Sequence, residues 1–373
     1  RNLTISGELD AATLDVSGDI DVDGTSNLDV VDIDGAVDMA STLAVAGVLT
    51  GASLDISGDI DIDGTSNLDI VDVDVSLNVD GTIKLDGNYP TGTDNVAMGN
   101  TALDSVEAGG INNVAIGDDA LTALTTGDNN TAVGKASLKT AVTSLSNTAI
   151  GSLALCTNTG GNNTAIGANA MECNTSGDNN TAVGKQANFK NTTGTNNSSL
   201  GTLALKCNTT GANNVAVGRD SLAANTTADN NTAIGYSALV TNTTGASNVA
   251  VGLCALHANT SGSSNTAVGS LSLVANTTGA LNTAVGLNAL TANTEGHCNT
   301  AAGALALNKN TTGDFNTAFG FCSLRCNLTT DQNTAIGAFA LNKNVANSNT
   351  AVGNESLKCN TSGAGNVSVG STS

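Results

Sequence analysis

A repeating pattern of small apolar and polar positions fills residues 95–370. Glycine closes a phrase typified by Asn-Thr-Ala-Val-Gly, and this repeat glycine occurs 17 times, from Gly99 to Gly370. Successive repeat glycines are usually 17 residues apart, as Gly201 and Gly218 are. One step is a single residue longer, and two are a single residue shorter. A strict period of about 17 residues is the signature of a solenoid, in which each repeat forms one coil stacked on the last. The pattern predicts a β-solenoid of 16 coils over residues 95–373.

Fixed residue types recur around each repeat glycine. The residue two before it is Ala or Ser, and the residue one before it is usually Val or Ile. Three residues after it stands Ala or Ser, and four after it stands Leu in 14 of 16 coils, Met171 and Asn188 being the exceptions. Glycine permits the positive φ that turns a chain sharply. We predict that each coil contains a strand, a tight link at the glycine, a second strand and a turn, with Val, Ile and Leu buried.

Asparagine stands four residues before every repeat glycine, from Asn95 to Asn366. Stacked coils place identical side chains about 4.8 Å apart. Amides at this spacing can hydrogen-bond to the equivalent amides above and below. We predict such a ladder, and its most regular part comprises Asn130, Asn147, Asn163, Asn180, Asn197, Asn214, Asn231, Asn248, Asn265, Asn282, Asn299, Asn316 and Asn333.

The strand phrase Thr-Ala-Val-Gly is apolar on both of its faces. Ala and Gly face one way and Thr and Val the other, because successive strand residues alternate. A single coil would leave one of these faces in water. The pattern therefore predicts that the second face packs on partner chains.

Residues 1–87 follow a different pattern, and Pro90 lies in the linker, residues 88–94, that separates the two parts. Residues 14–34 and 54–74 are near-copies that differ only by Val/Ile exchanges. Within each copy Asp alternates with Ile or Val, which is typical of a strand with one buried face. We predict a short-stranded, acidic β shaft for residues 1–87.

Charge and composition exclude several function classes. The chain carries a formal net charge of −21, with no Trp, two Tyr and five Phe among 373 residues. An acidic surface repels phosphate backbones, so we expect no nucleic-acid partner. No stretch of about 18 apolar residues occurs, so we expect no membrane insertion.

Eight cysteines are scattered through the repeats without a Cys-x-x-Cys pair. We predict that they are interchangeable free thiols, because other coils place Ala, Lys or Thr at the same positions. Cys156 and Cys173 lie in neighbouring coils, which leaves a disulfide between them as the alternative.

The acidic segment contains two stretches that match the opening of a calcium loop, Asp19, Asp21 and Asp23 followed by Gly24, and Asp59, Asp61 and Asp63 followed by Gly64. The acid expected at loop position twelve is absent, since Val30 and Ile70 stand there. We interpret the aspartates as a solvated strand face, with calcium binding as the alternative. No other cofactor is indicated.

No catalytic motif accompanies the repeats. His257 and His297 fall at different places in their coils and have no acid at a fixed spacing. No serine nucleophile elbow, phosphate-binding loop or zinc-protease motif occurs. The sequence predicts a protein that is not an enzyme.

The phrase Asn-Thr-Ala-Val-Gly-x-x-Ala-Leu-x-x-Asn-Thr-Thr-Gly resembles the head repeats of trimeric autotransporter adhesins of the YadA type. It resembles the repeat tracts of marine bacteriophage tail fibres more closely still, and the Val-Ser-Gly-Asp-Ile-Asp-Val-Asp-Gly phrases look like their shafts. The resemblance implies a left-handed homotrimeric β-roll on the virion surface, which attaches to a host receptor such as a glycan or outer-membrane component. It also implies a C-terminal chaperone that is cut off after Ser373.

The resemblance leaves alternatives open. A bacterial trimeric surface adhesin or an extracellular filament subunit shares the same architecture. Weaker alternatives are an ice-binding solenoid and a polysaccharide-degrading β-helix. Within a fibre, we expect receptor specificity at irregular positions, namely the turns at 141–146 and 344–349 and the cluster of Phe315, Phe319 and Phe321.

Overall fold

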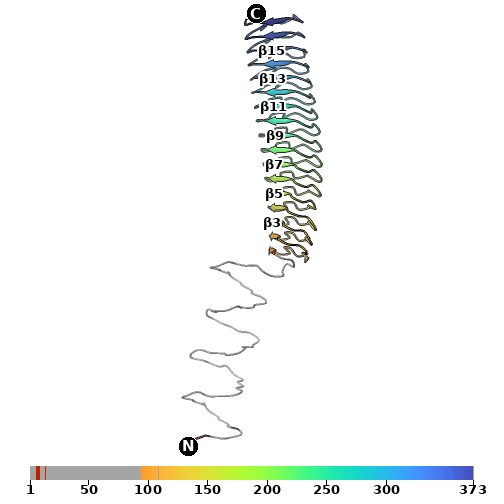
Figure 1. The fold of residues 1–373 in the computed structure, drawn as a ribbon, viewed down its shortest axis with the longest axis vertical. Coiled ribbons are helices and arrows are strands. Elements are labelled where there is room, and N and C mark those ends of the chain that lie inside the picture. Colours follow the sequence, from red (N-terminus) through yellow and green to blue (C-terminus); the bar gives the residue numbers. More distant parts are fainter. Residues whose placement is uncertain (1–5, 9–12, 14–93, 108, 373) are drawn as a thin grey trace. The chain divides into compact units, whose positions relative to one another are not determined.

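The repeats form a stack of coils, each of which contributes one short strand. The computed structural model describes residues 6–8, 13, 94–107 and 109–372. In these residues 17 strands of three residues form one parallel sheet, and there is no helix. Figure 1 shows the strands lying one above another along the coloured part of the chain. The prediction of an all-β, parallel β-solenoid of about 16 coils is confirmed.

Every strand occupies the three positions before a repeat glycine. The strands are β1 Val96–Met98, β2 Val114–Ile116, β3 Thr131–Val133, β4 Thr148–Ile150, β5 Thr164–Ile166, β6 Thr181–Val183, β7 Ser198–Leu200, β8 Val215–Val217, β9 Thr232–Ile234, β10 Val249–Val251, β11 Thr266–Val268, β12 Thr283–Val285, β13 Thr300–Ala302, β14 Thr317–Phe319, β15 Thr334–Ile336, β16 Thr350–Val352 and β17 Val367–Val369.

The register places equivalent repeat positions side by side. Ala250 of β10 pairs with Ala267 of β11, one repeat later. The irregular steps keep the same register, since Ala97 pairs with Ala115 across the longer step and Ala149 with Ala165 across a shorter one. Extra or missing residues are therefore absorbed in the turns and leave the strands aligned.

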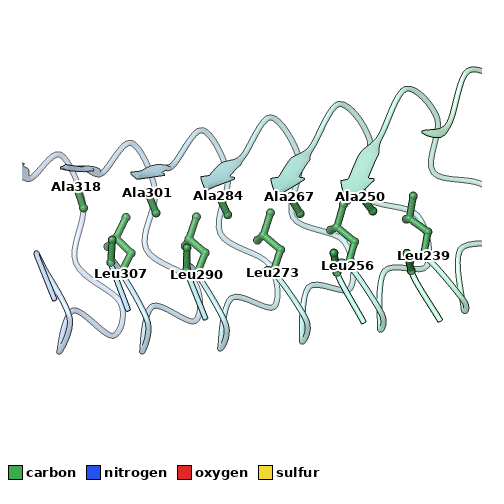
Figure 2. Packing of buried hydrophobic residues seen from close by; sticks show 14 of the residues in the cluster. Leu239, Ala250, Leu256, Ala267, Leu273, Ala284, Leu290, Ala301, Leu307 and Ala318 are labelled. Carbon is green, nitrogen blue, oxygen red and sulfur yellow. The ribbon is translucent and has the colours of Figure 1, made fainter. Parts of the chain in front are cut away.

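The core is a double row of alanine and leucine. The central Ala of most strands is fully buried, as are most of the Ala or Ser residues three positions after the repeat glycine and the Leu residues four after it. Figure 2 shows Ala284 and its equivalents pointing inward from the strands toward Leu290 and its equivalents on the opposite side of the coil. Such small side chains keep the coil thin, so each layer is held mainly by the layers above and below.

The predicted second strand is wrong. The segment after the repeat glycine forms turns, and its residues two and four positions on adopt positive φ, for example Leu153 at 59° and Leu155 at 51°. In a strand, successive side chains would point to opposite faces. The left-handed residues curl the backbone instead, so that Ala154 and Leu155 are both buried in the core.

The predicted burial of Val and Ile is also wrong within the single chain. Residues at the third strand position face outward, and they range from half-buried to exposed, as in Ile150, Ile234 and Ile336. Leucine and alanine supply the core in their place.

The repeat glycine serves the turn that was predicted for it. All 17 repeat glycines have φ between 126° and 138°. At Gly252, a Cβ atom would lie 2.6 Å from the carbonyl oxygen of Gly269. Both the backbone conformation and the close approach of the next coil therefore require glycine.

One coil interrupts the core. Asn188 occupies the position that Leu holds in most coils, and it is fully buried. Its Oδ1 and Nδ2 atoms have no hydrogen-bond partner. The buried apolar residues form two clusters, one ending at Ala187 and the other beginning at Ala204. Asn188 lies at the break between them.

Candidate functional site: an uncharged sheet face on an asparagine-braced rod

The asparagines four residues before the repeat glycine form a continuous buried column. Asn265 is typical: its backbone N–H and its Nδ2 both donate to Oδ1 of Asn248, at 3.0 and 3.2 Å. Its Nδ2 also donates to the carbonyl oxygen of Gly279 at 2.8 Å, and its Oδ1 accepts the N–H of Asn282. The backbone-to-Oδ1 bond recurs at every step of the stack, and the structure places each member of the predicted ladder in this column.

A second asparagine column runs beside the first, seven residues after the repeat glycine. Asn259 donates from Nδ2 to Oδ1 of Asn242 at 2.8 Å and to the carbonyl oxygen of Gly262 at 2.9 Å. The same amide-to-amide bond joins successive coils from Asn158 to Asn327. This second ladder was not predicted from the sequence. The recurrence of asparagine at one repeat position was the signal that could have revealed it.

The outward face of the sheet carries no charge. This sheet face consists of the first and third residues of each strand, mostly Thr or Val and then Val or Ile, and none of the 17 strands contains a charged residue. Many of its apolar side chains are exposed, including Ile116, Leu200, Val285 and Phe319. This sheet face is therefore uncharged and largely apolar along the whole described stack.

The charged residues lie in the turns. Lys139 Nζ lies 2.9 Å from Asp119 Oδ2, and this hydrogen bond, together with one from Thr101, holds the pKa of the Asp119 carboxyl below its usual value. The same contact raises the pKa of Lys139. Arg219 lies over the ring of Tyr236, 5.9 Å from its centroid. The Lys139–Asp119 pair is partly buried, and Arg219 and Tyr236 are exposed.

The cysteines are free thiols in the structure, as predicted, and no disulfide joins Cys156 to Cys173. Burial, followed by the nearby Glu172 carboxylate, raises the pKa of both of these thiols. Cys322 is buried, and its pKa is raised for the same first reason. No group of three or more metal-ligating side chains occurs in the part of the chain that the structure describes.

The two histidines occupy turn positions. The backbone N–H of Ala280 donates to Nδ1 of His297 at 3.0 Å. The backbone N–H of His297 in turn donates to Oδ1 of Asp314. Asp128 and Asp178 accept a backbone N–H of the preceding coil in the same manner. His297 therefore replaces an aspartate in a turn.

The irregular turns proposed for specificity both expose apolar side chains, and Val345 is the exposed one in the second turn. The turn at 141–146 exposes Val142 and Leu145. The turn at 344–349 is closed by Asn344, whose Nδ2 donates to Ala346 O and whose Oδ1 accepts Nδ2 of Asn349.

The predicted cluster of Phe315, Phe319 and Phe321 does not form a ring stack. All three are exposed, but the one aromatic ring pair among the described residues joins Phe321 to Phe339, edge to face at 5.3 Å. The three rings do not stack on one another because Phe315, Phe319 and Phe321 occupy different positions around the coil.

The six calcium candidates, Asp19, Asp21, Asp23, Asp59, Asp61 and Asp63, lie outside the described residues, as do almost all of the predicted shaft and its linker. The described residues contain no helix that could span a membrane.

No protein-family model, curated protein or solved structure matches this chain.

Proposed function

We propose that the protein is a structural fibre segment whose solenoid associates through the sheet face as a homotrimer. The observation that carries this proposal is the absence of charge along all 17 strands of an outward-facing sheet. Burying exposed Val, Ile, Leu and Phe side chains is favourable by about 25 cal/mol per Å² of apolar surface. A long row of such side chains favours a long partner.

A second copy of the chain fits this row best. A partner must offer apolar groups at the same spacing, about 4.8 Å per layer, along the whole stack. Another copy of the chain has the same apolar residues at the same spacing. Rotational symmetry places each strand opposite the same strand of the other copies.

We assign the fibre to host attachment on a virion surface, on the strength of the tail-fibre resemblance. Its partner there is a host-cell glycan or outer-membrane component. A bacterial surface adhesin or extracellular filament subunit is the alternative biological setting, and neighbouring baseplate or secretion genes would discriminate the two. Neither setting requires catalysis, a cofactor, nucleic-acid binding or membrane insertion.

Native mass tests the proposal directly. Sedimentation of the intact protein should give a trimer, with three times the mass of the 36.5 kDa chain. An unheated SDS gel run in parallel should retain that trimer. A stable monomer with a fully hydrated sheet face would refute the trimeric fibre, and open-ended polymers would favour the extracellular filament.

Ice binding is the second candidate, and one observation favours it. Thr and Val or Ile form two parallel rows on the regular outward face of the sheet, as in Thr266 and Val268 beside Thr283 and Val285. Such regular rows on a flat face are a surface that an ordered water layer can match. A monomer that shows thermal hysteresis would support ice binding, because a trimer would bury the same face.

A further inference from the structure

Four basic residues occupy one corner of the last four complete coils. Lys309, Arg325, Lys343 and Lys358 stand five or six residues after their repeat glycines, in four successive coils. We call them the basic ridge. The five preceding coils, with repeat glycines from Gly218 to Gly286, carry no Lys or Arg at these two positions. The ridge is therefore a local feature and not part of the repeat.

Backbone hydrogen bonds fix the spacing of the ridge. Lys309 N donates to Arg325 O at 3.1 Å, and Lys343 N donates to Lys358 O at 3.0 Å. Between these pairs Cys326 N donates to Asn342 O at 3.0 Å. The backbone positions of the four residues thus follow one another along the axis at about 4.8 Å per coil, and the residues alternate between two neighbouring repeat positions.

The ridge has little internal neutralisation. Lys358 pairs with Glu355, Nζ to Oε1 at 2.7 Å. The other three cations form no ion pair with any described residue, and Nε of Arg325 is buried without a hydrogen-bond partner. The two other acids of residues 303–373 are Asp314 and Asp331. Their Oδ1 atoms already accept backbone N–H groups in the turn.

An aromatic pair adjoins Lys358, one of the four cations. Phe321 meets Phe339 edge to face, and Lys358 Nζ lies 5.1 Å from the centroid of the Phe339 ring. Phe321 is 47% exposed. The apolar body of such a ring packs on the C–H-rich face of a sugar, while the neighbouring cations attract anionic substituents.

From this arrangement we propose that the basic ridge and Phe321 bind a linear acidic polysaccharide that carries carboxylate or sulfate groups and runs along the solenoid axis. The inference deepens the attachment role proposed above and rests on it. Nucleic acid fits less well, because successive bases stack on open ring faces. Here the two rings meet edge to face, and Lys358 lies over the ring of Phe339.

Binding of defined polymers to the intact protein tests the inference. Isothermal titration at physiological salt should detect heparin or polygalacturonate, and not uncharged dextran. The triple variant Lys309→Gln/Arg325→Gln/Lys343→Gln should weaken binding by about tenfold or more, because it removes three of the four charges that attract the polymer. Phe321→Ala should weaken it without changing its salt dependence, because this variant removes no charge.

A matched control comes from the same corner of earlier coils. Lys190 and Lys206 also stand five or six residues after their glycines, but without an aromatic pair of the kind seen beside the ridge. Lys190→Gln/Lys206→Gln should leave binding intact. Equal loss in this control, tighter binding of DNA than of either polyanion, or no binding of either polyanion would overturn the inference.

Sedimentation of the same samples separates the two proposals. A trimer that binds neither polyanion would refute the ridge alone. A monomer that binds through the ridge would refute the trimeric fibre alone.

Discussion

At the scale of single residues, the backbone conformation of each coil depends on a few positions with positive φ. At the repeat glycines this conformation coincides with a close approach of the neighbouring backbone. At Leu155 and its equivalents, the positive φ instead directs the side chain into the core. The left-handed conformation costs free energy at a residue other than glycine, and the packing between coils must offset this cost.

Gly252→Ala should destabilise the solenoid. The backbone at φ 137° costs alanine about 1–3 kcal/mol. The added Cβ would also lie 2.6 Å from Gly269 O. Gly109→Ala is the control, since its Cβ would make only an ordinary contact, 3.4 Å from Thr126 Cγ2. Thermal unfolding of both variants measures the difference, and equal melting temperatures would contradict the role given to the repeat glycine.

The thiols should differ in reactivity with iodoacetamide. Burial raises the pKa of Cys156, Cys173 and Cys322, and the thiolate is the nucleophile. The alkylation rates of these three cysteines should therefore rise at a higher pH than the rate of a thiol whose pKa is not raised. Cys322 should react most slowly. Cys359, which is exposed, should react first. Mass spectrometry of timed samples measures the order, and labelling in denaturant should abolish it.

The same pKa shifts have a consequence for stability. A thiol whose folded pKa is raised keeps its proton to a higher pH in the folded state than in the unfolded state. Its contribution to stability is present below the unfolded pKa and is lost as pH rises through the folded one. The melting temperature should accordingly fall with rising pH in the alkaline range where thiols ionise, and less so when the three cysteines are replaced by alanine.

At the scale of the element, one coil differs from the others in its core. Met171, Asn188 and Leu205 occupy equivalent positions in three successive coils, and only Asn188 brings unsatisfied polar atoms into the stack. Ser199, in the strand β7, adds a second polar side chain nearby. This coil should be the weakest layer of the solenoid.

Asn188→Leu should stabilise the protein. The substitution removes two unsatisfied polar atoms, each of which costs about 1–3 kcal/mol, and joins the two apolar clusters. Leucine tolerates the required positive φ less well than asparagine, which offsets part of this gain. A net gain of roughly 1–2 kcal/mol is expected in denaturant titration.

Asn191→Leu, three residues further on, is the matched control. Asn191 Nδ2 donates to Asn174 Oδ1 at 2.6 Å and to Gly194 O at 2.9 Å. The same exchange should therefore destabilise at this position, by roughly 1–3 kcal/mol for each group left unsatisfied. Stabilisation by both substitutions would show that hydrophobicity alone, and not hydrogen bonding, decides the outcome.

The sequence was sufficient to predict the solenoid, its period and its glycine turns, because each depends on residues that recur at one fixed position. The second strand was predicted wrongly, since Ala-Leu phrases such as 154–155 do not reveal that leucine will adopt a positive φ. The outward position of Val and Ile also escaped prediction, because apolar residues are expected to be inside. The pairing of Phe321 with Phe339 depends on coil geometry that the spacing of the phenylalanines does not disclose.

At the scale of the whole molecule, the sheet face and the basic ridge divide the proposed work between self-association and recognition. The first is uncharged and runs through every coil. The second is charged and confined to four coils. Substitutions on one should leave the other intact, which makes the two roles separable by experiment.

Val268→Asp should dissociate the trimer without unfolding the coils. Val268 lies on the sheet face and is 37% exposed, so a single chain accommodates the carboxylate in water. Three such carboxylates in one interface layer would be desolvated and mutually repulsive. Leu281→Asp is the control, because Leu281 is exposed in a turn off the strands. Sedimentation should give a monomer for the first variant and a trimer for the second, and circular dichroism should remain unchanged in both.

The uniform register of the strands has a consequence for how such a gene can evolve. Because each coil contacts chiefly its two neighbours, and every neighbour presents the same columns, a whole coil can be duplicated or removed without creating a mismatched surface. Length can then change in steps of one coil, about 4.8 Å each, while the four coils of the basic ridge stay as they are.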